Sequence, residues 1–159
     1  MILYHGSNVE VKEPKIMIVD RTHDFGFAFY LTEHQNQAEK WAFTKCYRNE
    51  DGKPIISVFH WDEDITGFKF KKFEDISEDW LDLVCKCRSI KTYKHGYDIV
   101  KGKVADDKVA ETVNFYLEGI ITKEQALERL KYSNVNSQIA FCSEEALKHL
   151  KFIKSYEVK

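Results

Sequence analysis

The sequence predicts an α+β fold, in which short apolar strands and amphipathic helices follow one another along the chain. Two observations predict it. Segments rich in aromatic and β-branched residues alternate in polarity with a period of two, which is typical of strands. Elsewhere, apolar residues recur every three or four positions behind Ser or Thr, which is typical of capped helices. The 159 residues are expected to form a single domain, residues 1–159, that needs neither metal nor disulfide for stability.

The first part of the chain predicts two strands and a helix. Ile2–His5 is a short apolar strand, and Gly6 permits a sharp turn or a close approach of another backbone. Phe27–Thr32 forms a second, aromatic strand. Thr32 and Gln35 have the spacing of a capping box, so a helix is expected to begin there. The apolar stripe of this helix is formed by Ala38, Trp41, Ala42 and Lys45/Cys46.

The remaining elements are predicted in the same way. Helices are expected to begin near Ser77, Asp107, Thr122 and Ser143, and the Thr122 helix has Gln125 at capping-box spacing. The segment from Lys91 to Tyr97 mixes basic and aromatic residues and is interpreted as a solvated loop, although such a mixture can also stack on single-stranded nucleic acid. Further strands are expected at Ile55–Trp61, Phe68–Phe73, Tyr97–Val100, Gln138–Cys142 and Phe152–Val158.

Composition excludes several classes of function. Charged residues make up 31% of the chain with both signs interspersed and a net charge of −2, so no global field attracts nucleic acid or an anionic membrane. No segment approaches the ~20 apolar residues that span a bilayer, and no signal peptide is recognised, so a cytoplasmic location is expected. The four cysteines lack zinc-ligand spacing and are expected to be reduced thiols, with no metal bound.

Two short motifs carry the functional signal. Leu3-Tyr4-His5-Gly6-Ser7 is an apolar strand that ends in His-Gly-Ser, and Gly26-Phe27-Ala28-Phe29-Tyr30-Leu31-Thr32 is a glycine-led strand that enters a helix. Each motif alone is explained by core packing. Together they resemble the NAD-binding half of the ADP-ribosyltransferase superfamily. The similar branch contains poly-ADP-ribose polymerases and diphtheria-type toxins, and its signature is a histidine, a tyrosine and a glutamate on three separate strands.

More closely, the chain from Ile2 to about Ile153 resembles a family of small, functionally unassigned bacterial proteins related to that superfamily, some of which act as toxins in toxin–antitoxin pairs. The resemblance implies two antiparallel sheets packed face to face, flanked by helices, with an NAD cleft between them. It also implies that NAD is a substrate, that no metal is used, and that the acceptor is a protein or nucleic acid. A toxin would have an antitoxin protein as its partner.

The resemblance further implies roles for individual residues. His5 is expected to bond a ribose hydroxyl, the Gly6 backbone to hold the nicotinamide amide with help from Ser7, and Tyr30 to stack on the nicotinamide ring. Arg21 is expected to contact the NAD pyrophosphate, against the alternative that it is a solvated loop charge. Asp24, expected to fix its turn through backbone N–H groups, is counted with Gly26 and Thr32 among the NAD-binding residues. Further candidates for the cleft are Asn136, Asp98, Asp106 and Asp107, where aspartates at the start of a helix are otherwise explained as caps.

The sequence departs from the family pattern at the third signature position, where Gln138 stands in place of the glutamate. Cleavage of the nicotinamide–ribose bond develops positive charge on the ribose, which a carboxylate stabilises. Loss of a unit charge at ~4 Å would slow the reaction up to ~10³-fold. Gln138 can still bond the ribose hydroxyl. His5, Tyr30 and Gln138 are therefore the expected catalytic residues of a mono-ADP-ribosyltransferase, and poly-ADP-ribose elongation is not expected.

Two other functions remain open at this stage. The first is a non-catalytic module that binds NAD or retains only the shape of the pocket, which the replacement of glutamate by Gln138 favours. The second is NAD-dependent removal of an RNA 2′-phosphate, which also resembles this superfamily and does not need the glutamate. That reaction requires several cations around the RNA phosphate, and the arginine-poor composition argues against it.

Overall fold

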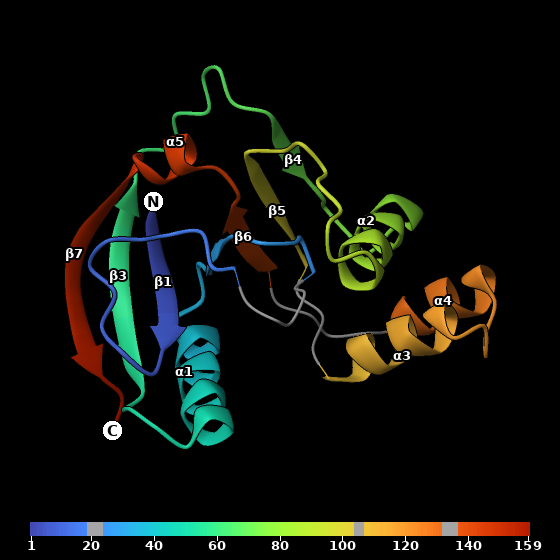
Figure 1. The fold of residues 1–159 in the computed structure, drawn as a ribbon, viewed down its shortest axis with the longest axis horizontal. Helices are drawn as coiled ribbons and strands as arrows, with labels where there is room; N and C mark the ends of the chain where they lie inside the picture. Colours follow the sequence, from blue (N-terminus) through green and yellow to red (C-terminus); the bar gives the residue numbers. More distant parts are fainter. Residues whose placement is uncertain (19–23, 104–106, 132–136) are drawn as a thin grey trace.

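A computed structural model describes residues 1–18, 24–103, 107–131 and 137–159. The chain forms two β-sheets surrounded by helices, which confirms the α+β class (Figure 1). The first sheet has the strand order β1-β3-β7, and its strands are Ile2–Ser7, Ile55–Trp61 and Leu150–Glu157. The second sheet has the order β2-β6-β5-β4, and its strands are Phe29–Leu31, Ser137–Phe141, Ile99–Lys103 and Phe70–Lys72.

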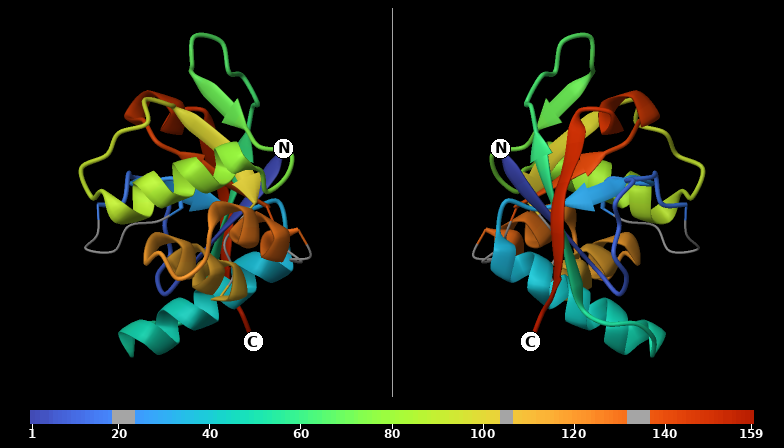
Figure 2. Two further views of the ribbon diagram at one scale, coloured as in Figure 1. Left: turned by 90° about the vertical axis from the view of Figure 1, so that its right-hand side faces the viewer. Right: turned by 90° about the vertical axis from the view of Figure 1, so that its left-hand side faces the viewer.

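The helices lie on two sides of these sheets. The helices are α1 (Gln35–Asn49), α2 (Glu78–Ser89), α3 (Asp107–Leu117), α4 (Lys123–Leu130) and α5 (Glu144–Leu147). Figure 2 shows α2, α3 and α4 facing the viewer in one view and β7 facing the viewer in the opposite view, so these elements lie at opposite ends of the molecule. Within the described ranges, no helix has the length and apolar content that a membrane crossing requires.

The two sheets are antiparallel except at one pair of strands, β4 and β5, which run parallel. This pair differs from the wholly antiparallel arrangement that the sequence analysis expected. The reason is the connection between them: α2 carries the chain from the end of β4 back to the start of β5, and such a helical crossover joins parallel strands.

Alternate residues of β2 pack into two separate cores. Phe29 and Leu31 belong to a buried cluster between the sheets, together with Leu3 and Phe59 of the first sheet. Tyr30 points the other way and packs against a second cluster that includes Trp80 of α2. Successive side chains of β2 point to opposite faces, so one face of the strand packs into the core between the sheets and the other into the core beside α2.

The two sheets meet at a bridge between β1 and the end of β2. The amide of Tyr4 donates to the carbonyl of Thr32 at 2.8 Å, and the amide of Thr32 donates to the carbonyl of Tyr4 at 3.0 Å. The Thr32 hydroxyl donates to the Ser137 carbonyl at 3.0 Å and accepts from the His34 amide. Thr32 therefore does not cap α1 as predicted: the N-cap is His34, and its side chain makes no capping bond.

The other predicted helix starts are confirmed. Ser77 accepts from the amide of Trp80, and Ser143 accepts from the amide of Ala146. Thr122 and Gln125 form a complete capping box, with both reciprocal hydrogen bonds present. The side-chain oxygen of each cap satisfies an amide that the first helical turn leaves without a partner.

Candidate functional site

The three strands that carry His5, Tyr30 and Gln138 lie next to one another where the sheets meet. β2 pairs with β6, with Tyr30 opposite Ala140 and Leu31 opposite Ile139, so Gln138 lies near Thr32. The bridge between Tyr4 and Thr32 brings β1 to the same place. The backbone thus collects the three predicted catalytic positions at one junction of the fold.

His5 is buried, with 9% of its surface exposed, and its imidazole stacks on Phe29 with ring centroids 4.2 Å apart. Its Nδ1 atom lies 2.8 Å from the carbonyl oxygen of Tyr30. A carbonyl can only accept, so Nδ1 carries the proton and Nε2 keeps a lone pair. Burial lowers the pKa of His5 to about 4, with a smaller contribution from the charge of Lys45. The imidazole is therefore neutral at pH 7, and Nε2 can accept a hydrogen bond from a hydroxyl.

Gly6 allows α1 to approach β1 closely. A Cβ atom at this position would lie 2.0 Å from the carbonyl oxygen of Ala38 and 3.0 Å from the backbone nitrogen of Ala42, far inside van der Waals contact. The neighbouring Ser7 is buried, and its hydroxyl donates to the side-chain oxygen of Asn8 at 3.4 Å. The His-Gly-Ser motif therefore has a packing role in addition to the role that the resemblance implies.

Tyr30 organises the loop that precedes β2. Its hydroxyl donates to the carbonyl of Gly26 at 2.5 Å and accepts from the amide of Phe25 at 3.2 Å. Gly26 has φ +82°, the left-handed region that favours glycine. Burial is the main cause that raises the pKa of Tyr30 well above its usual value, so the phenol keeps its proton. Its side chain leaves β2 on the face opposite to Phe29, so the phenol and the imidazole of His5 lie on different faces of this strand.

A chain of three polar side chains runs from α2 through the loop before β2 to β6. The Nε and Nη2 atoms of Arg88 donate to one carboxylate oxygen of Asp24, at 2.9 and 2.6 Å. The Nε2 atom of Gln138 donates to the other oxygen of Asp24 at 3.2 Å. Asp24 and Gln138 are almost completely buried, at 5% and 3% exposed. Asp24 therefore uses its carboxylate to hold two side chains, and its bonding to backbone N–H groups of the turn stays a prediction.

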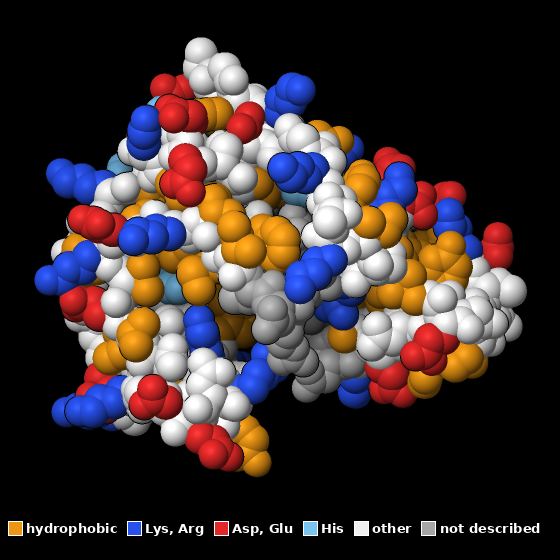
Figure 3. Space-filling view, in the orientation of Figure 1, with side chains coloured by type: hydrophobic (Ala, Val, Ile, Leu, Met, Phe, Trp, Pro, Cys, Tyr) orange, Lys and Arg blue, Asp and Glu red, His pale blue; other side chains and the backbone are white. Residues whose placement is uncertain are grey.

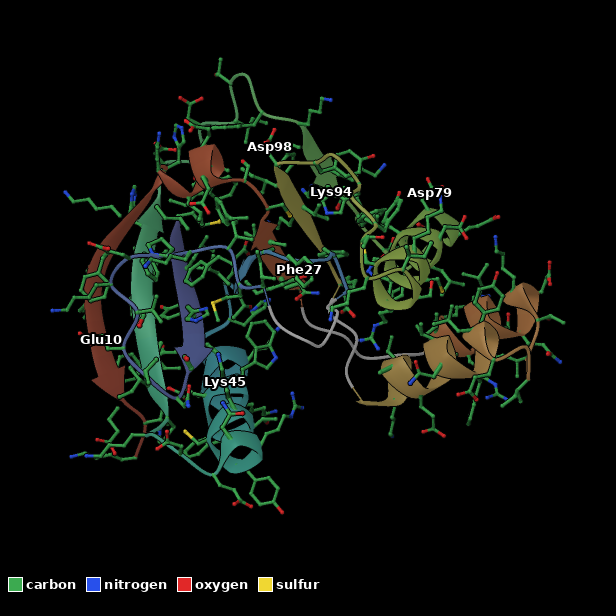
Figure 4. The ribbon with its side chains drawn as sticks, viewed as in Figure 1. Glu10, Phe27, Lys45, Asp79, Lys94 and Asp98 are labelled. Carbon is green, nitrogen blue, oxygen red and sulfur yellow. The ribbon has the colours of Figure 1, made fainter. Side chains whose placement is uncertain are left out.

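Lys45 is a second feature that the sequence analysis did not connect with the site. It lies on α1 beside the end of β1, where it projects from the helix (Figure 4). Burial lowers its pKa, and its charge acts on His5. A half-buried ammonium at this place attracts an anionic group. In the sequence, Lys45 follows Ala38 and Ala42 at helical spacing on the apolar stripe. This spacing indicates that Lys45 lies on the face of the helix that is turned toward the sheet.

Several predicted residues cannot be assigned to this junction. Arg21, Asp106 and Asn136 lie outside the described residues, and Asp107 begins α3 with its side chain also outside them. Asp98 precedes β5, whereas Gln138 pairs with Gly102, four residues along that strand or about 13 Å away. The Asp98 carboxylate accepts from the amide of Lys69 at 2.8 Å, and Figure 4 shows Asp98 far from Lys45. Asp98 thus has a structural role at the remote end of β5.

The charged side chains on the surface follow the even distribution of the two signs in the sequence. Figure 3 shows acidic and basic side chains interspersed over the visible face, with no large area of one sign. In the part of the chain that the structure describes, no group of three or more His, Cys, Asp or Glu side chains could hold a metal ion.

Comparison with known proteins places the chain in a family. Neither the curated proteins nor the solved structures give a significant match. The model of one protein family, described as "Protein of unknown function (DUF3990)", matches residues 1–152 and so covers nearly the whole chain. The protein therefore belongs to the DUF3990 family, whose function is unknown.

Proposed function

We propose that the protein is an NAD-dependent mono-ADP-ribosyltransferase whose site lies at the junction of β1, β2 and β6. The observation that carries this proposal is the adjacency of these strands. They bear the histidine, the tyrosine and the glutamine that resemble the three-residue signature of the ADP-ribosyltransferase superfamily. The arrangement of two sheets, with a helix after the second signature strand, supports the same superfamily fold, with NAD bound where the two sheets meet.

The proposed reaction breaks the bond between nicotinamide and ribose. Nicotinamide leaves with the bonding electron pair, positive charge develops on the ribose, and a nucleophile of a protein or nucleic-acid acceptor forms the new bond and loses its proton. The Nε2 lone pair of His5 would accept from a ribose hydroxyl. Tyr30 lies on the other face of β2, so the nicotinamide would have to extend past this strand to pack on its ring. Lys45 would bind the diphosphate, because it is a half-buried cation close to His5.

The carboxamide of Gln138 would bind the ribose in place of the usual glutamate. It positions the sugar but carries no charge, so the expected turnover is slower than with a glutamate by up to ~10³-fold. The acceptor would receive a single ADP-ribose unit, because elongation depends on a carboxylate that activates the incoming hydroxyl. If the protein is a toxin, the partner that restrains it would be an antitoxin protein that covers this junction.

The test uses purified protein, NAD labelled in the adenosine part, and a cell extract as the source of acceptors. We expect release of nicotinamide and transfer of label to macromolecules, both reduced about 100-fold or more by His5→Ala, which removes the hydroxyl acceptor. The matched control is His60→Ala, because His60 is exposed on β3 and outside the junction. Absence of both nicotinamide release and labelled product would contradict the proposal.

A second candidate is a non-catalytic module that binds NAD without consuming it. Two observations favour it: Gln138 replaces the charged residue of the signature, and the Tyr30 hydroxyl is bonded within its own loop. Calorimetry with NAD, followed by analysis of the recovered nucleotide, separates the candidates. Binding with intact NAD after prolonged incubation supports the module, and the appearance of nicotinamide supports the enzyme.

A further inference from the structure

Asp24 is a charged residue in direct contact with Gln138, which stands at the position of the missing glutamate. Its side chain is 6% exposed, and one of its oxygens lies 3.2 Å from the Nε2 atom of Gln138. The other oxygen receives two hydrogen bonds from Arg88, whose side chain is 22% exposed. A carboxylate is therefore present beside the signature position, although the sequence places it 114 residues away from Gln138.

This contact determines which end of the Gln138 amide is available to a ligand. An ionised carboxylate only accepts hydrogen bonds, so the NH2 group of Gln138 must face Asp24. The amide oxygen consequently points away from Asp24 and can accept from a hydroxyl. Arg88 reinforces this orientation, because its two donors keep Asp24 in place.

We infer that Asp24 is the positioning residue of the proposed site: through its hydrogen bond it fixes the Gln138 amide oxygen as an acceptor for a ribose hydroxyl. Asp24 also supplies, one side chain further from the sugar, the negative charge that the glutamate of the superfamily supplies directly. The inference rests on the proposed function. In the superfamily, a single glutamate binds the ribose hydroxyl and supplies the negative charge. In this protein, Gln138 would bind the hydroxyl and Asp24 would supply the charge.

The inference predicts an unusual effect of Asp24→Asn. Arg88 can only donate, so it would take the amide oxygen of the new side chain, and the new NH2 group would face Gln138. Gln138 would then turn its own oxygen inward and present NH2 to the ligand, which is the wrong polarity for the hydroxyl contact. We expect kcat for nicotinamide release to fall about 10- to 100-fold, with a smaller change in KM, because the charge on the ribose develops only in the transition state.

Adding Gln138→Glu to this variant should restore the activity. The double variant Asp24→Asn/Gln138→Glu keeps the same number of charges and can form the same hydrogen bonds among Arg88, position 24 and position 138, but the carboxylate now lies at the signature position. We expect kcat at least equal to that of the wild type. Gln138→Glu alone would bring two carboxylates within hydrogen-bonding distance, so it should lower the melting temperature by about 5 °C or more and give no gain in rate.

Two control variants repeat the same chemical changes elsewhere. Gln125→Glu keeps the capping box of α4, where glutamate serves as well as glutamine. Asp51→Asn keeps the side-chain oxygen that accepts from the amide of Gly52 in an exposed turn. Both should leave the rate of nicotinamide release and the melting temperature unchanged, which shows that the effects at Asp24 and Gln138 depend on their contact.

The possible results separate the inference from the proposed function. If the wild type releases nicotinamide and Asp24→Asn releases it equally fast, the inference is overturned and the proposed function stands. The same holds if the double variant is no faster than Asp24→Asn while both melt as cooperatively as the wild type. If the wild type releases no nicotinamide, the proposed function is overturned and the positioning role of Asp24 is overturned with it.

Discussion

His5 shows how a single residue links burial to the pH dependence of stability. Its imidazole is enclosed by Phe29 and the backbone of Tyr30, and its pKa in the folded protein is about 4 against 6.5 for an unperturbed histidine. Between these two values the unfolded chain binds a proton that the folded chain does not. The contribution of His5 to the free energy of unfolding is therefore fully present above pH 6.5, and it is lost as the pH falls from 6.5 toward 4.

We predict that this single group makes the free energy of unfolding about 3 kcal/mol lower at pH 4 than at pH 7. Urea denaturation at both pH values should show the drop in the wild type and a drop smaller by that amount in His5→Gln, which cannot take up the proton. His60→Gln, at an exposed histidine, should behave as the wild type. An equal pH dependence in His5→Gln and the wild type would show that the imidazole is not buried as described.

Individual site residues were predictable from the sequence only where a motif marked them. His5, Tyr30 and Gln138 were found because each lies in a short strand motif. Arg88 was not predicted as a site residue, because nothing along the chain indicates that its partner is Asp24, 64 residues earlier. Contacts of this kind depend on how α2 packs on the second sheet, which local spacing does not determine.

At the scale of single elements, hydrogen bonds to side-chain oxygens decide where helices begin. Ser77, Thr122 and Ser143 were correctly identified as caps, because each hydroxyl finds its partner within its own helical turn. Thr32 has the same local spacing, but its hydroxyl donates to the Ser137 carbonyl on the neighbouring strand. A cap is therefore predictable from sequence except where a strand from elsewhere in the chain takes the hydroxyl.

Removal of the capping box should measure its contribution directly. We predict that Thr122→Ala lowers the free energy of unfolding by about 1 kcal/mol, because the amide of Gln125 loses its acceptor. Thr44→Ala serves as the comparison: the Thr44 hydroxyl bonds the Lys40 carbonyl inside α1, and alanine is the better helix former. Thermal unfolding should show a loss only for Thr122→Ala. A comparable loss in Thr44→Ala would assign the effect to side-chain volume and not to capping.

At the scale of the whole molecule, the class of the fold was predictable and the direction of one strand was not. Periods of two and of three to four residues gave the strands and helices, and hence the α+β class. The parallel pair β4–β5 arises because α2 lies between these strands and returns the chain to the same end of the sheet. Sequence periodicity shows which residues lie on one face, but it does not show which neighbour a strand chooses.

The reactivity of the cysteines tests how α2 and β6 are packed. Burial raises the pKa of Cys85 to about 11 and those of Cys87 and Cys142 to about 12, so these thiols form little of the reactive thiolate at pH 8. We predict that an excess of a maleimide reagent labels one thiol of the native protein quickly, that of Cys46 on α1, and all four after unfolding in urea. Cys46→Ser should abolish the fast phase, as measured by mass spectrometry. Fast labelling of two or more thiols in the native state would contradict the described packing around α2 and β6.

The contact between Gly6 and α1 constrains how this family can vary. With only a hydrogen atom between the strand and the carbonyl of Ala38, any larger residue at position 6 must displace the helix and, with it, Lys45. The atoms in the way are backbone atoms of Ala38 and Ala42, so no change of side chain at these two positions can make room. Natural homologues that keep this helix packed on the strand should therefore keep glycine at position 6, while the residues around it diverge.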